Sequence, residues 1–156
     1  MASASHILCA AVAILGVVFQ AAALLSPTWK RYEAKGSPIK NRPPVMVYEF
    51  LDEWNGTKLT FLVSEFMAML LLLIAAVAHI MAIVSRSFSE AIRGVAHILN
   101  ITATFLILMG LLVLMAKYGN ILQMFYVGLG AVVAASGLSL FAVICSGVDD
   151  DKHHAT

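Results

Sequence analysis

The sequence predicts an all-α membrane protein, an antiparallel bundle of four transmembrane helices forming a single domain over residues 1–156. Of these residues, 61% are apolar and only 12% are charged, whereas a soluble domain is closer to half apolar and a quarter charged. The charged residues also cluster, which leaves four long apolar stretches between them. A helix needs about 20 apolar residues to cross the hydrocarbon core of a bilayer, and each stretch reaches that length.

The four helices are expected at residues 6–25, 59–84, 95–116 and 122–145. Backbone groups in lipid cannot bond to water, so each span is expected to be helical throughout. Residues 27–58 then form the one long loop, and 146–156 form a short tail. The first span is expected to be a retained helix rather than a cleaved signal peptide, because no basic side chain precedes it.

Several polar side chains fall inside these spans, where ionisable groups are expensive and each needs an explanation. They are Gln20, Glu65, His79, His97, Asn100 and Thr104. Gln20 and Glu65 lie at similar depth near the long-loop ends of the first two spans, which predicts a hydrogen bond between neighbouring helices. A structural role is favoured for both, because polar groups near helix ends can also reach the interface.

His97, Asn100 and Thr104 follow one another at i, i+3 and i+7, so they share one helix face. His79 lies at a depth comparable to that of His97, and two facing histidines are what a bis-imidazole haem requires. No other cofactor signature accompanies them, and no further ligand stands at zinc spacing. We therefore expect hydrogen bonding inside the bundle, with His97 bonded alongside Asn100 and Thr104.

Small residues in the fourth span carry the clearest packing signal. Ala131, Ala135 and Ser139 repeat every four residues, with Gly128 and Gly130 close by. Small side chains at that spacing let helix backbones approach closely in lipid. This face is expected to be buried against protein.

The sequence also argues against several classes of function. It has no paired carboxylates, no nucleophile beside a base, no CxxC pair and no phosphate-binding glycine loop. The basic residues of the long loop alternate with acidic ones, which does not fit a nucleic-acid surface. The expectation is a protein that is not an enzyme and that binds no cofactor, metal or nucleic acid.

Signals for orientation conflict. An even number of spans places both termini on one side, and seven Lys and Arg lie on the long-loop side against three on the terminal side. This count would place the long loop in the cytoplasm. Asn55 begins an Asn-Gly-Thr glycosylation sequon, which is useful only outside the cytosol. Cys145, at the end of the fourth span, is a candidate for palmitoylation. Alternatively, it packs in the core as a small apolar residue.

The layout of four spans, a long first loop and a short tail resembles the claudin and peripheral-myelin-protein superfamily, which includes gamma subunits of ion channels. Residues 26–30 (Ser-Pro-Thr-Trp-Lys) resemble the end of that family's first helix. Residues 110–112 with 125–130, and 144–146 (Ile-Cys-Ser), resemble its third and fourth helices. The family's Gly-Leu-Trp motif with two loop cysteines is absent here.

The resemblance implies cytosolic termini at the plasma membrane and an extracellular long loop that forms a small β-sheet or hairpin. Residues 45–51 are rich in β-formers and would supply one strand. It also implies a claudin-like, non-enzymatic role in cell–cell contact or membrane organisation. The alternatives are an auxiliary subunit of a channel, transporter or receptor, and a small haem-bearing or respiratory-complex subunit. Expected partners are the lipid bilayer and other membrane proteins or further copies of the chain.

Overall fold

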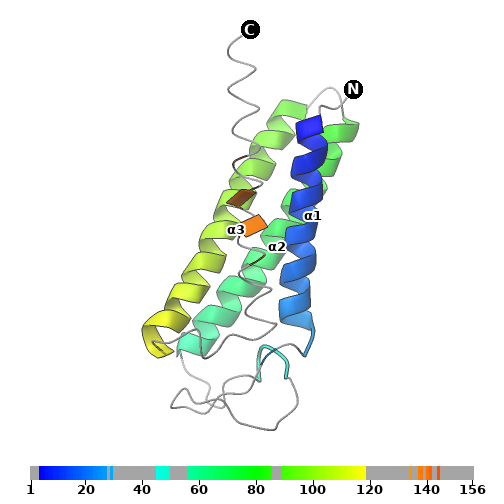
Figure 1. Cartoon of the computed structure of the whole chain (residues 1–156). Helices are drawn as coiled ribbons and strands as arrows, with labels where there is room; N and C mark the ends of the chain where they lie inside the picture. Colours follow the sequence, from blue (N-terminus) through cyan, green and yellow to red (C-terminus); the bar gives the residue numbers. More distant parts are fainter. Residues whose placement is uncertain are drawn as a thin grey trace.

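Three long helices make up most of the part of the chain that the computed structural model describes. The described residues are 4–27, 29, 45–49, 56–85, 89–118, and six positions between 134 and 144. The helices are α1 (Ala4–Leu25), α2 (Gly56–Val84) and α3 (Ser89–Tyr118). They lie side by side and alternate in direction (Figure 1). Each is long and apolar enough to cross a membrane, so the chain is a multi-pass integral membrane protein.

The helices extend beyond the apolar spans from which they were predicted. α1 ends at Leu25 as expected, but α2 begins three residues early at Gly56 and α3 six residues early at Ser89. At 1.5 Å per residue α2 is about 43 Å long, whereas the hydrocarbon core is about 30 Å thick. Hydropathy marks the part of a helix in hydrocarbon, and polar turns continue the helix beyond that part.

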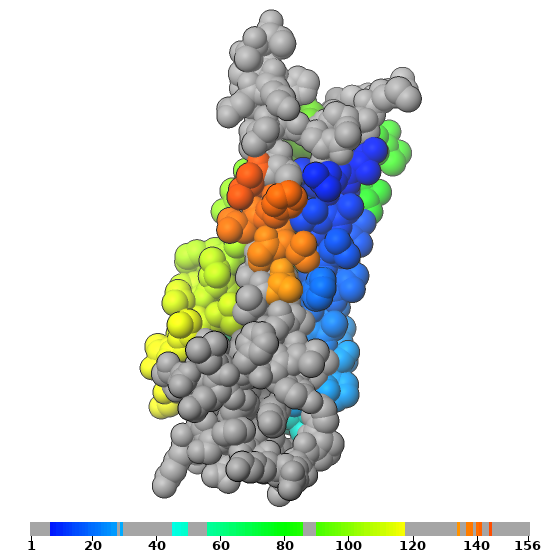
Figure 2. All heavy atoms as spheres, viewed as in Figure 1, coloured from blue at the N-terminus to red at the C-terminus, as the bar shows by residue number. Residues whose placement is uncertain are grey.

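The fourth predicted span, 122–145, lies outside the described residues except at six positions. These six positions are all helical in conformation. Figure 2 shows them, in orange, between α1 and α3 on the face in view. A fourth transmembrane helix therefore stays a prediction.

α2 is the central helix and packs against both α3 and α1. The buried residues of each helix follow alternating steps of four and three. On α2 they include Phe61, Glu65, Ala68, Leu72, Ala75 and His79. On α3 they include Ala96, Asn100, Ala103, Ile107, Gly110 and Leu114. On α1 they include Cys9, Ala13, Gly16, Gln20 and Ala23. This seven-residue period is that of left-handed helix packing.

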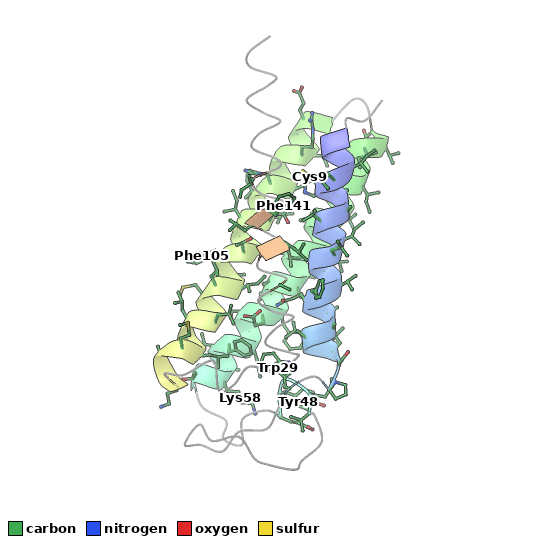
Figure 3. The ribbon with its side chains drawn as sticks, in the orientation of Figure 1. Cys9, Trp29, Tyr48, Lys58, Phe105 and Phe141 are labelled. Carbon is green, nitrogen blue, oxygen red and sulfur yellow. The ribbon has the colours of Figure 1, made fainter. Side chains whose placement is uncertain are left out.

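The outer faces of the helices are apolar and the interior holds the polar groups. Phe105 is 61% exposed and points away from the other helices (Figure 3), and large aliphatic side chains such as Val63 and Leu112 are also exposed. Gln20, Glu65 and most other polar side chains of the spans are buried. In water this distribution would be unfavourable. In a bilayer it places apolar side chains against the lipid and keeps the polar groups inside the bundle.

Candidate functional site

A polar contact joins α1 to α2 near their long-loop ends. Gln20 Nε2 donates to Glu65 Oε2 at 2.6 Å and lies 3.3 Å from the backbone oxygen of Glu65. Both side chains are fully buried. Equal depth on neighbouring spans predicts this pair, and the structure brings the two together. The second carboxyl oxygen, Glu65 Oε1, and the amide oxygen, Gln20 Oε1, have no hydrogen-bond partner among the described residues.

α3 contributes a glycine to the same place. A Cβ atom added to Gly110 would stand 2.5 Å from Glu65 Oε1 and 2.6 Å from Ser64 Oγ. Real Cβ atoms do not approach oxygens so closely, so the bare glycine backbone makes the room for the carboxyl group. Three helices therefore meet at what we call the carboxyl cluster: Gln20, Ser64, Glu65 and Gly110.

Glu65 has no cationic partner within the described part of the chain. The only hydrogen bond of its carboxyl group there is the one that Oε2 accepts from Gln20. Lys58 lies two turns nearer the long loop on α2 and is itself buried and engaged in a contact. The carboxyl cluster is thus a buried acidic group held by an amide, without an ion pair among these residues.

A second polar contact joins α2 to α3 near the opposite end of the bundle. His79 Nε2 and Asn100 Nδ2 are 3.0 Å apart, and both side chains are buried. Because an amide nitrogen can only donate, the imidazole Nε2 is the acceptor. Thr104 donates its hydroxyl to the backbone oxygen of Asn100, one turn away.

His97 differs from the expectation. The hydrogen bond across the helix pair is made by Asn100, and His97 Nδ1 has no partner among the described residues although that atom is buried. The predicted face is shared by the three residues, but Asn100 and Thr104 are buried while His97 is half-buried. Asn100 occupies a position of the seven-residue period of buried residues on α3, whereas His97 does not.

The long loop is tied to the helices by Trp29 (Figure 3). Its indole Nε1 donates to the backbone oxygen of Ala23 at 2.6 Å, and its ring meets the ring of Phe61 edge-on with centroids 5.7 Å apart. Its backbone forms a single antiparallel bridge with Val45 through two hydrogen bonds. Trp29 therefore holds two parts of the loop against the ends of α1 and α2.

The strand expected at 45–51 is not formed by the described residues 45–49. Val45 alone pairs with Trp29, and the chain then turns, with the Glu49 amide donating to the oxygen of Met46. Val47 is fully buried while Tyr48 and Glu49 are exposed. The alternation of apolar residues here reflects one buried contact within a turn rather than a sheet.

The remaining predicted site residues lie outside the described residues. They are the packing residues Gly128, Gly130, Ala131, Ala135 and Ser139, the sequon at Asn55, and Cys145. No group of three or more His, Cys, Asp or Glu side chains among the described residues is placed to hold a metal ion.

Sequence reasoning missed the role of Gly110 and the partner of Asn100. The usable signal was the seven-residue spacing of small and polar residues on α3, from Ala96 through Ala103 to Gly110. Helices that approach closely in lipid place small residues in their contact. That period contains Gly110, and alternating steps of four and three along it would also have placed Asn100 in the interface.

Comparison with known proteins assigns no family to the chain. No protein-family model, no curated protein and no solved structure matches it. The resemblance to the claudin superfamily therefore rests on the residues quoted for it. The chain is a multi-pass membrane protein, and buried polar contacts join α1 to α2 and α2 to α3.

Proposed function

We propose that the chain is a non-enzymatic membrane protein that acts by association at cell–cell contacts, in the manner of claudin-like proteins. The observation that carries the proposal is the anchored loop. Trp29 fixes the loop to α1 and α2, and Val47 of the loop is fully buried, while Tyr48 is 46% exposed. A loop held in this way presents a defined surface, and exposed tyrosine is a residue that contact surfaces favour.

The helices support the same proposal. Two buried polar pairs, Gln20 with Glu65 and His79 with Asn100, bond from helix to helix and hold the bundle that carries the loop. In this proposal the loop faces outward from the plasma membrane, the termini are cytosolic, and the partner is a second copy of the chain on the neighbouring cell.

The test uses cells that carry a fluorescent fusion of the full chain, mixed with cells that lack it. The protein should concentrate at borders between two expressing cells and not at borders with the others. Tyr48→Ser should reduce this enrichment at an unchanged surface amount. Phe105→Leu, on the lipid-exposed face of α3, is the matched control and should leave it unchanged.

A border between two expressing cells contains two labelled membranes, so fluorescence there that does not exceed the sum of two mixed borders would show the contact role to be wrong. Native purification then identifies the alternative. A larger membrane protein recovered in stoichiometric amount would instead assign the chain as an auxiliary subunit.

A further inference from the structure

The carboxyl cluster contains an acidic group that has no cationic partner among the described residues. Glu65 is fully buried in α2, nine residues from the start of the helix at Gly56. That places it about 13 Å along the helix axis, within the apolar span. Gln20 satisfies Oε2, while Oε1 lies against Gly110 without a hydrogen-bond partner among the described residues.

The charged groups on the surrounding helices lie toward the helix ends, the nearest along the chain being Lys58 on α2 and Lys117 on α3. Residues 7–25 of α1 and 94–116 of α3 contain no charged side chain. On α2, Lys58 lies seven residues towards the loop and forms no ion pair with Glu65. His79 lies fourteen residues in the other direction and is bonded to Asn100. An isolated carboxylate in such surroundings is strongly disfavoured unless it gains a neutralising partner.

We propose that the carboxyl cluster is an intramembrane proton-binding site, in which Glu65 Oε1 holds the proton while Oε2 keeps the amide of Gln20. A proton is small enough for the space left by Gly110, where a further side-chain atom is not accommodated. The same oxygen both holds the proton and contacts α3, so proton binding and helix packing are linked through one atom.

The experiment uses a membrane-permeant carbodiimide, dicyclohexylcarbodiimide, on the full chain in lipid vesicles at neutral pH. A protonated carboxyl group gives its proton to one carbodiimide nitrogen, and its oxygen bonds to the central carbon. In the absence of water the acyl group then moves to nitrogen, so the whole reagent stays attached as an N-acylurea. Peptide mass spectrometry locates the adduct.

We expect an adduct at Glu65 that is lost in Glu65→Gln and that forms equally in sodium, potassium and N-methylglucamine salts. Glu90, an exposed carboxyl at the start of α3, is the matched control. Glu90 should instead react with a water-soluble carbodiimide and an added amine. These water-soluble reagents should leave Glu65 unmodified.

Three results would overturn the proposal. One is the absence of the adduct on wild-type Glu65. Another is modification of Glu65 by the water-soluble reagent as readily as Glu90, which would show an open, hydrated carboxylate. The third is saturable protection by sodium or potassium alone, which would assign the site to a metal cation. The wild-type chain decides all three, so they do not depend on whether a variant folds.

Discussion

Two glycines of α3 illustrate how a single residue depends on its surroundings. Gly110 lies against the carboxyl group of Glu65 and the hydroxyl of Ser64, whereas a Cβ on Gly94 would meet no atom within 4 Å. In a helix interior glycine is less favourable than alanine by about 1 kcal/mol. At Gly94 that preference acts alone, while at Gly110 it is opposed by contact with two oxygens.

The first prediction compares Gly110→Ala with Gly94→Ala. Gly110→Ala should lower the free energy of unfolding by about 1–3 kcal/mol, the usual cost of overpacking, because Glu65 and α2 must shift. Gly94→Ala should be neutral or raise stability by roughly 0.5–1 kcal/mol. Unfolding of the detergent-solubilised protein measures both. Equal effects of the two substitutions would contradict the close approach of α3 to the carboxyl cluster.

At the scale of elements, α2 and α3 form the most extensive helix pair among the described residues. Small residues, including Ala68, Ala75 and Ala103, are fully buried along it. His79 and Asn100 add one hydrogen bond across the pair. Small residues permit close packing at many rotations about the helix axis, whereas a polar contact is satisfied in only one. The polar pair therefore defines the register of the two helices.

The second prediction is a double-mutant cycle on this pair, with His79→Leu, Asn100→Leu and the double variant. The coupling energy should be about 0.5–2 kcal/mol, the range measured for hydrogen bonds between membrane helices. Thr102 is the control, because its hydroxyl bonds to the Ile98 oxygen of its own helix and the side chain is exposed. Thr102→Val should show no coupling to His79→Leu. Full additivity for His79 and Asn100 would contradict the bond.

At the scale of the whole molecule, the alternating direction of the helices determines which helix ends lie on the same side of the bundle. The end of α2 and the start of α3 lie at the same end of the bundle as the start of α1 (Figure 1), and Trp29, which pairs with Val45, lies at the other end (Figure 3). Which end faces the cytosol determines whether the anchored loop can contact another cell. The excess of basic residues on the loop side opposes the proposed orientation, and acidic residues nearby do little to change that count.

The third prediction is that 27–58 is extracellular. Single cysteines at Ser37 and Ser89, in a Cys9→Ala, Cys145→Ala background, report the two sides. An impermeant maleimide added to intact cells should label position 37 and spare position 89, and both should react after permeabilisation. Labelling of position 89 alone would reverse the orientation and remove the basis for an extracellular contact role.

The sequence by itself predicted that the chain lies in lipid, that it is helical and roughly where α1, α2 and α3 lie. Spans of about 20 apolar residues fit transmembrane helices and few other structures. It also placed Gln20 and Glu65 at one depth, since depth follows from counting residues along a helix. The rotation of each helix about its axis was decided only by the tertiary structure. In lipid both faces of a helix are apolar, so the pattern that reveals the interior of a water-soluble bundle is weak here. For that reason Asn100 rather than His97 meets His79, and Gly110 meets Glu65, through packing that hydropathy does not encode. The loop contact was likewise decided by the tertiary structure, because the bridge between Trp29 and Val45 depends on where the ends of α1 and α2 lie in space.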